Sequence, residues 1–120
     1  MASHKRTDRI NRLLQQHISS IIQRDVKNPR IGFVTVTKVS ISRDLRHAKI
    51  FVSILGEKDK RDQSLDALTK ATPFIRREIA ARIKLRYTPE IRFYYDETIE
   101  KAVRIFSLLE EVKKTEDKGK

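Results

Sequence analysis

Two stretches of β-branched residues in the middle of the chain constrain its fold more than any other feature. The first, RIGFVTVTKVSIS, covers residues 30–42, and the second, HAKIFVSIL, covers residues 47–55. In the second stretch, apolar residues alternate strictly with other residues, which is typical of a strand with one buried face: Ala48, Ile50, Val52 and Ile54. The polar connection RDLR between the stretches is short, so the pattern predicts a β-hairpin.

The first of these strands changes phase along its length. Val34 and Val36 follow one alternation, whereas Val39 and Ile41 follow the other. Either both faces of the strand are partly buried, or a bulge near residues 37–38 shifts the register by one residue.

An amphipathic helix is predicted ahead of the hairpin, within residues 7–26. Thr7 or Asp8 is its expected N-cap, and it must end before Asn28, because a residue that precedes proline is disfavoured in helical geometry. Its apolar residues recur at spacings of three and four: Ile10, Leu13, Leu14, Ile18, Ile21 and Ile22.

After the charged loop GEKDKRD, a second helix is expected to begin at Ser64 as N-cap and to carry Leu65, Leu68 and Ala71. Pro73 then interrupts the pattern, since proline lacks an amide proton and clashes within a helix. Proline suits the first position of a new helix, with Thr72 as its N-cap. The sequence therefore predicts two helices that meet at a bend.

The C-terminal third predicts one more strand and one more helix. Pro89 opens a strand in which Ile91, Phe93 and Tyr95 alternate, and Asp96 or Thr98 can cap the helix that follows. Its expected apolar face consists of Ile99, Val103, Phe106 and Leu109. Residues 1–112 are expected to form one domain, and residues 113–120 a flexible basic tail.

The predicted fold class is α+β, with helices on one face of a three-stranded sheet. The element order is that of a KH-like domain of type II topology with an added C-terminal helix. The glycines are Gly32, Gly56 and Gly119, and none lies between the two central helices. An Ala-X-Pro bend would thus stand where ordinary KH domains have the GXXG loop that clamps a nucleic-acid backbone.

Charge is the main indication of a partner. In 120 residues, 27 lysines and arginines oppose 16 acidic residues, for a formal net charge of +11 and a pI near 10.2. Such a balance favours a polyanionic partner, above all nucleic acid, with an anionic membrane surface or no particular partner as alternatives. The sequence shows neither a signal peptide nor a long apolar span, so we expect a cytoplasmic protein.

Catalysis, metals and cofactors find little support in the sequence. It contains no cysteine, which excludes thiolate zinc sites and cysteine nucleophiles. His4, His17 and His47 lack metal-ligand spacing, and no phosphate-binding glycine loop is present. We therefore expect no catalytic residue, no metal site and no cofactor.

The candidate RNA-binding residues lie in three segments. Those around the bend are Lys70, Thr72, Arg76, Arg77, Lys84 and Arg86; those in the hairpin turn are Arg43 and Arg46; and those at the start of the first helix are Lys5 and Arg6. Helix-start amides beyond Pro73 could add donors for a phosphate. Arg82 lies close to the apolar stripe formed by Ile75, Ile79 and Ile83, so its stem either covers the core or reaches RNA.

Three long stretches resemble the ribosome-binding factor A family, and the similarity covers nearly the whole chain. They are RINRLLQQHISSII, VTVTKVSISRDLRHAKIFVS and KATPFIRREIAARIKLRYTPEIRFYYDETIE. In the family an Ala-X-Gly bend replaces the GXXG loop, and the matching positions here are Ala71, Thr72 and Pro73. Proline in place of glycine removes a backbone donor and flexibility at residue 73.

The resemblance implies a non-catalytic assembly factor. It implies binding to the free or immature small (30S) ribosomal subunit and its 16S rRNA, with a role in late maturation, in processing of the RNA's 5′ end and in growth at low temperature. It also implies a partner GTPase that promotes release, while the absence of heptads favours a monomer. A general nucleic-acid binder, which net charge alone would produce, is the alternative.

Overall fold

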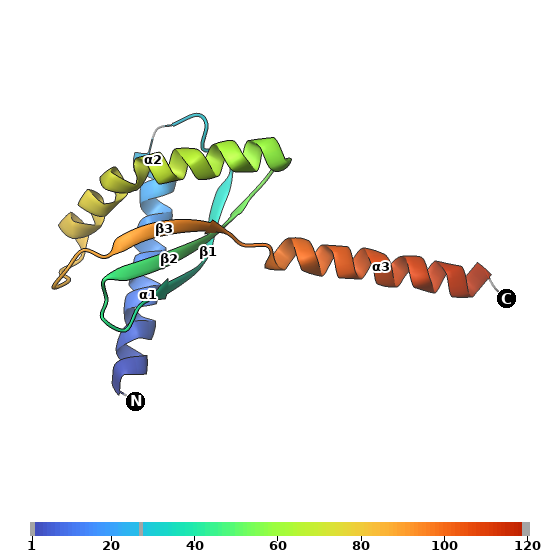
Figure 1. Cartoon of the computed structure of the whole chain (residues 1–120), viewed down its shortest axis with the longest axis horizontal. Helices are drawn as coiled ribbons and strands as arrows, with labels where there is room; N and C mark the ends of the chain where they lie inside the picture. The colour runs from blue at the N-terminus through green and yellow to red at the C-terminus, as the bar shows by residue number, and fades with distance from the viewer. Residues whose placement is uncertain (1, 27, 119–120) are drawn as a thin grey trace.

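A computed structural model describes the backbone of residues 2–26 and 28–118, and the side chains of residues 6–26, 28–98 and 101–112. Three α-helices and three strands account for most of it (Figure 1). In chain order they are α1 (Ala2–Ser20), a π-helical turn η1 (Ile21–Asp25), β1 (Val34–Ile41), β2 (His47–Ile54), α2 (Lys58–Arg82), β3 (Glu90–Tyr95) and α3 (Thr98–Lys118). The expected mixture of α and β elements is confirmed.

The three strands form one sheet in the order β1-β2-β3. β1 and β2 are the antiparallel arms of the predicted hairpin, and β3 runs parallel to β2. Parallel neighbours need a crossover connection, and α2 supplies it. Helices α1 and α2 pack against the sheet and bury one of its faces, while the opposite face carries no helix and is turned toward the viewer in Figure 1.

The register of the hairpin contains the bulge that the valine pattern indicated. Val36 pairs with Val52, but the next paired residue is Lys38, opposite Phe51. The extra residue, Thr37, moves the second half of β1 into the opposite phase. Val39 therefore points into the same core as Val36, which confirms the bulge.

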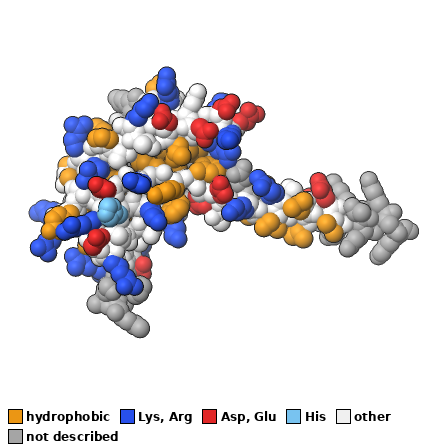
Figure 2. All heavy atoms as spheres, viewed as in Figure 1, with side chains coloured by type: hydrophobic (Ala, Val, Ile, Leu, Met, Phe, Trp, Pro, Cys, Tyr) orange, Lys and Arg blue, Asp and Glu red, His pale blue; other side chains and the backbone are white. Residues whose placement is uncertain are grey.

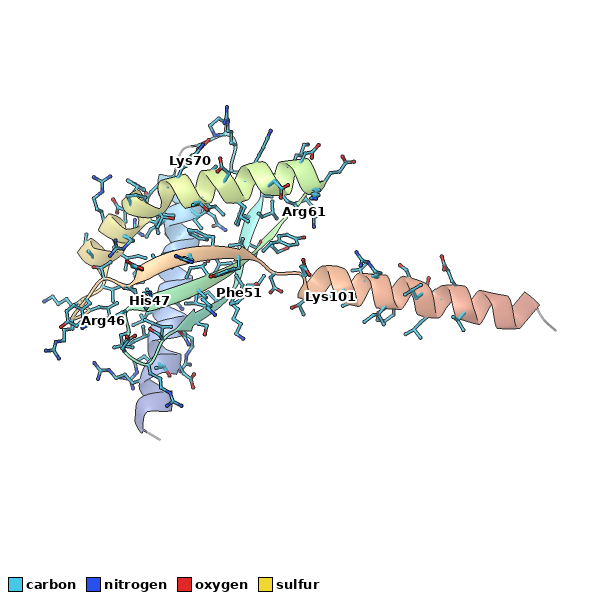
Figure 3. The ribbon with its side chains drawn as sticks, viewed as in Figure 1. Arg46, His47, Phe51, Arg61, Lys70 and Lys101 are labelled. Atoms are coloured by element: carbon cyan, nitrogen blue, oxygen red, sulfur yellow. The ribbon has the colours of Figure 1, made fainter. Side chains whose placement is uncertain are left out.

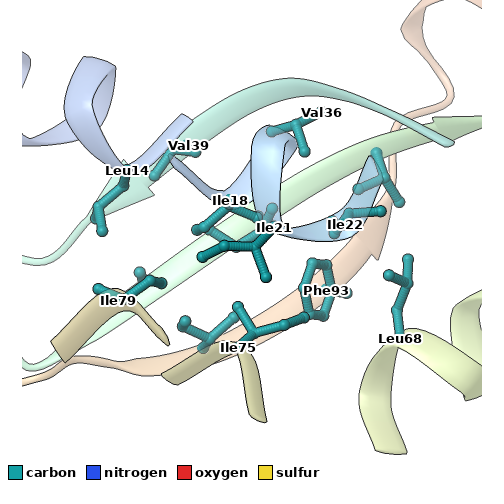
Figure 4. Close-up of a cluster of buried hydrophobic side chains, with 14 of the residues drawn as sticks. Leu14, Ile18, Ile21, Ile22, Val36, Val39, Leu68, Ile75, Ile79 and Phe93 are labelled. Carbon is teal, nitrogen blue, oxygen red and sulfur yellow. The ribbon is translucent and has the colours of Figure 1, made fainter. Parts of the chain in front are cut away.

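The core lies between the sheet and the two helices (Figure 4). Several of its side chains are completely buried: Leu14, Ile18 and Ile21 from the first helix and its π turn, Ile50 and Val52 from β2, and Leu68 and Ile75 from α2. These isoleucines, valines and leucines have few rotamers, so they specify one packing arrangement.

Helix α1 begins earlier than its apparent caps indicated. It starts at Ala2, so the prediction of an N-cap at Thr7 or Asp8 is wrong. The segment before Thr7 consists of residues that tolerate helical geometry, and a helix already anchored by packing extends through them. At its other end the π turn closes with the Val26 amide bonded to the Ile21 carbonyl at 2.9 Å, so the helical segment ends before Asn28 as predicted.

The prediction of two helices meeting at a bend is wrong, because α2 is one helix with Pro73 inside it. Thr72 is no N-cap, since its hydroxyl donates to the Leu68 carbonyl at 3.2 Å. Leu68 and Ile75 are both fully buried on the two sides of the proline, so packing on the sheet holds both halves in one helix. The ribbon nevertheless changes direction partway along α2 (Figure 1), as expected where a proline removes a helical hydrogen bond.

The expected cap of α2 at Ser64 is also wrong, because the helix already starts at Lys58. Ser64 is instead a buried bridge. Its hydroxyl donates to the Arg30 carbonyl at 3.1 Å and accepts from the Gly32 amide at 3.2 Å, which ties the segment before β1 to α2.

We expect Ser64→Ala to lower the free energy of unfolding by about 1–3 kcal/mol, because the buried hydroxyl makes two hydrogen bonds, to the Gly32 amide and the Arg30 carbonyl, and both are lost. Urea titration followed by circular dichroism measures this change. The control is Ser107→Ala on the exposed face of α3, which should shift stability by less than about 0.5 kcal/mol. Equal effects of the two substitutions would contradict the bridging role of Ser64.

Helix α3 departs from the prediction that the helices pack on one face of the sheet. It projects away from the sheet (Figure 1), and its large apolar side chains are 56–70% exposed: Val103, Ile105, Phe106, Leu108, Leu109 and Val112. The helix continues past Val112, where the sequence analysis ended the domain, to Lys118. No helix within the described residues has the length and apolar character needed to cross a bilayer.

Asp96 joins the end of β3 to the start of α3. It accepts from the Thr98 amide at 2.9 Å, as the cap prediction required, and from the Thr37 hydroxyl at 2.6 Å. The hydrogen bonds from Thr37 and Thr98 lower the pKa of Asp96 from 3.8 to about 2.

A folded-state pKa below the unfolded value means that the ionised carboxylate stabilises the fold above about pH 4. This contribution is lost as the pH falls through about 2. We expect Asp96→Asn to be less stable than the parent chain at pH 7, and the difference to shrink between about pH 4 and pH 2. Thermal unfolding across that range measures it, and a difference independent of pH would contradict the prediction.

Candidate nucleic-acid interface

The candidate RNA-binding residues lie toward the end of the molecule opposite α3. Figure 2 shows several lysine and arginine side chains there, and Figure 3 places Arg46 in the same region. The structure separates them into three groups: one at the proline kink of α2, one where α2 ends beside α1, and one at the turn between β1 and β2.

At the kink, the side chains differ in whether they form ion pairs within the protein. Lys70 is exposed and pairs with Asp66 at 3.0 Å, one helical turn earlier. Arg77 is exposed and, among the described residues, forms no ion pair. A shallow hollow beside it is lined by Pro73, Arg76, Arg77, Ala80 and Thr88. Arg77 is thus the cation of this group that is best placed to meet a phosphate.

Arg76 has a structural task that the sequence did not reveal. Its Nε donates to the Pro89 carbonyl and a terminal guanidinium nitrogen donates to the Thr88 carbonyl, both at 3.1 Å. These bonds hold the connection between α2 and β3 against the helix. An RNA contact of Arg76 stays a prediction, and it would have to use the remaining guanidinium nitrogen.

The second group is formed by tertiary contact between α1 and the end of α2. Arg6 and Arg9 of α1 and Lys84, which follows α2, line one hollow together with Ile10, Leu13, Ile83 and Leu85. Three cations from distant parts of the chain thus converge without an acidic residue in the lining. The side chain of Lys5, predicted for this group, lies outside the described residues.

The third group surrounds Tyr87. The guanidinium of Arg46 lies 5.2 Å from the centre of the Tyr87 ring, and that of Arg86 lies 5.6 Å from it. Tyr87 is 47% exposed, so an aromatic surface with two cations faces solvent. The sequence analysis named Arg46 and Arg86 but left Tyr87 out.

The turn that carries Arg43 and Arg46 is fixed by Asp44. Its carboxylate accepts from the Ser42 hydroxyl at 2.6 Å and from the Arg46 amide at 3.2 Å, and these bonds lower its pKa. Asp44 therefore shapes the turn, as expected for aspartate there. Arg43 is left exposed beside it.

Arg82 is engaged within the protein. Its guanidinium pairs with Asp25 of η1 and lies 3.6 Å from Glu78, so it joins the end of α2 to η1. Its omission from the candidate site is consistent with this contact.

Together, these groups offer charge rather than reactive chemistry. Exposed guanidinium and ammonium groups can neutralise phosphates and position a nucleic-acid backbone, but carry little sequence information. The described residues contain no cluster of acidic and histidine side chains that could hold a metal ion. Arg9 and Tyr87 were left out of the predicted RNA-binding set, although each lies close in sequence to a predicted member, Arg6 or Arg86.

A family model for ribosome-binding factor A matches residues 6–109, which covers most of the chain. The chain belongs to the ribosome-binding factor A family. The ribosome-binding factor A of Halothermothrix orenii is 50% identical over 113 residues, which cover 94% of this chain and 93% of that protein. That of Natranaerobius thermophilus is 51% identical over 115 residues, covering 96% and 88%.

Solved structures of ribosome-binding factor A share the fold. A solution structure from Thermotoga maritima, described as a putative member, is 35% identical with a TM-score of 0.66, covering 79% of this chain and 91% of that one. A Thermus thermophilus homology model, fitted into a cryo-electron microscopy map of a complex with the 30S subunit, is 25% identical with a TM-score of 0.59. It covers 71% of this chain and 89% of its own.

Proposed function

We propose that this chain binds the free or immature small ribosomal subunit through its 16S rRNA. The observation that carries the proposal is the convergence of Arg6, Arg9 and Lys84 in one hollow, with Arg77 exposed nearby in the last part of α2. Family membership supports it, since the Thermus relative has been fitted into a map of its complex with the 30S subunit.

Further details of the proposal rest on the family resemblance. The chain supports late maturation of the subunit and processing of the 5′ end of the rRNA precursor, and it supports growth at low temperature. It acts in the cytoplasm as a monomer without catalysis, and a ribosome-associated GTPase promotes its release. We also propose that the fold is KH-like with type II topology, and that the kink at Pro73 takes the place of the GXXG loop.

The contacts proposed here are electrostatic. Each phosphate neutralised on a nucleic acid contributes a slope of about −0.7 to −0.9 to the dependence of log affinity on log salt. Selectivity for one ribosomal subunit must therefore come from the shape of the folded rRNA and from neighbouring proteins. The binding free energy thus has an electrostatic contribution from the cations and a contribution from the shape of the RNA.

Sedimentation tests the proposal directly. The purified chain is centrifuged through a gradient with isolated small subunits, large subunits or joined ribosomes, at near-physiological salt and with duplex RNA as competitor. We expect comigration with free small subunits that survives the competitor. Equal binding to every particle, abolished by the competitor, would identify a general nucleic-acid binder and refute the proposal.

A further inference from the structure

The face of the sheet opposite the helices carries an unusual row of side chains. Lys38, Phe51 and Tyr94 stand side by side on β1, β2 and β3, because the strand registers pair Lys38 with Phe51 and Phe51 with Tyr94. The two ring centres are 5.7 Å apart, and the Lys38 ammonium lies 5.9 Å from the centre of the Phe51 ring. Figure 3 labels Phe51 on the face without helices.

Exposure to solvent alone does not explain why aromatic residues occupy this row. The solvent face of a sheet normally carries polar residues, yet here a phenylalanine occupies the central strand and Tyr94 beside it is 37% exposed. The rings are not part of the core cluster, which lies on the other face. They form an aromatic surface that is open on one side.

The neighbouring row adds positive charge. Lys49 of β2 is paired directly with Arg92 of β3, and both are exposed. Like charges opposite each other in a sheet are unfavourable, and among the described residues neither forms an ion pair. Because Lys49 lies on the central strand, protection of a sheet edge does not explain it. An anion bound between them would relieve the repulsion.

The acidic residues on the same face are already engaged. Glu90 lies 3.4 Å from the ring nitrogen of His47 at one end of the strands, and Asp96 accepts hydrogen bonds from Thr37 and Thr98 at the other end. The centre of the face therefore combines two adjacent rings with three cations, Lys38, Lys49 and Arg92. Figure 2 shows blue and orange side chains adjoining one another over the strands.

We propose that this open sheet face binds unpaired RNA, with a base stacked on Tyr94 and Phe51 and the backbone phosphates on Lys49 and Arg92. Aromatic side chains on a cationic surface are the usual means of holding single strands, because every base has a face that can stack. The inference goes beyond the proposed function and does not rest on it, since the α2 cations lie outside this face.

Fluorescence anisotropy with a labelled, non-self-complementary single-stranded RNA of about ten nucleotides tests the proposal on the full chain. Tyr94→Leu should weaken binding about five- to 100-fold, because the bulk of the side chain is kept but its ring is lost. Tyr94→Phe should bind like the parent chain. Lys49→Gln should reduce the slope of log affinity against log salt by about 0.7.

Repeating the measurement in a chain that carries Arg77→Glu separates the contribution of this face from that of the cations on α2. In a chain that carries Arg77→Glu, Tyr94→Leu should cause the same fold loss of single-strand affinity, because independent sites act additively. Circular dichroism checks that each variant remains folded. Sedimentation with small subunits is a separate readout, so failure of the proposed function would not be mistaken for failure of this inference.

Three results would overturn the inference. One is that the parent chain binds the single strand no better than a duplex of the same sequence. Another is that Tyr94→Leu and Tyr94→Phe weaken binding equally, which would make the loss a matter of the hydroxyl rather than of stacking. The third is that the chain dimerises in sedimentation equilibrium and Tyr94→Leu disperses the dimer, which would assign the face to a second copy.

Discussion

Reversing the charge of Arg77 and Lys84 together, as Arg77→Glu with Lys84→Glu, is expected to weaken binding to the small subunit by about 10- to 100-fold at near-physiological salt. Both side chains are exposed, and neither forms an ion pair among the described residues, so their reversal breaks no ion pair of the fold there. Two lost phosphate contacts should also reduce the slope of log affinity against log salt by about 1.4 to 1.8. Titrations of subunits at several salt concentrations measure both quantities.

The matched control for this variant reverses two cations at the other end of the same helix, as Lys58→Glu with Lys60→Glu. Both residues are exposed, and the control carries the same change in net charge. If net charge alone drives binding, the two double variants will lose affinity equally, and our placement of the interface will be wrong. A loss confined to Arg77 and Lys84 would locate the contact.

Arg76 is left unchanged in this test for a structural reason. Because its guanidinium holds the Thr88 and Pro89 carbonyls, replacing it would disturb the connection to β3 along with any RNA contact. A binding loss in an Arg76 variant would therefore have two explanations. Arg77 has no charged residue three or four positions away on the helix, so its reversal changes no helical pair.

Ile75→Ala is expected to lower the free energy of unfolding by about 2–5 kcal/mol, the largest stability effect that we predict. Ile75 is completely buried and lies just past Pro73, where it anchors the second half of α2 to the core. Shortening its side chain leaves a cavity and weakens the packing of the part of the helix that carries Arg77. Urea unfolding measures the loss.

The control for the core substitution is Ile105→Ala on α3. Its side chain is 58% exposed, so the same chemical change should alter stability by less than about 0.5 kcal/mol. A small effect of Ile75→Ala, similar to that of the control, would show that the second half of α2 does not depend on the core. The role of Ile75 in anchoring α2 to the core would then be contradicted.

Local patterns in the sequence were sufficient for the sheet. Three features depend on which face of a strand is buried: the alternation in β2, the phase change at Thr37 and the strand after Pro89. Neighbouring residues in the sequence reveal which face that is. The end of the first helical segment before Asn28 was predictable for the same reason, because proline restricts the residue before it. The order of elements and the α+β class follow from these features.

The candidate site was only partly predictable. The cations near the kink and in the hairpin turn could be named from local spacing. The sequence could not predict that Lys70 pairs with Asp66 or that Arg76 holds a loop, because each side chain has several possible partners. Nor does any local signal bring Arg6 and Arg9 of α1 to Lys84. That hollow exists because the segment that follows α2 lies beside the first turns of α1.

What the sequence determined by itself was therefore the identity and faces of the strands, the net charge and the family. The tertiary structure alone decided that α2 continues through Pro73, that α3 leaves its apolar side chains exposed, and which cations converge. The physical reason is the distance along the sequence over which each feature is determined. Strand alternation is set by adjacent residues, whereas the cost of a proline in a helix is offset by burial of Leu68 and Ile75 against a sheet that is distant in sequence.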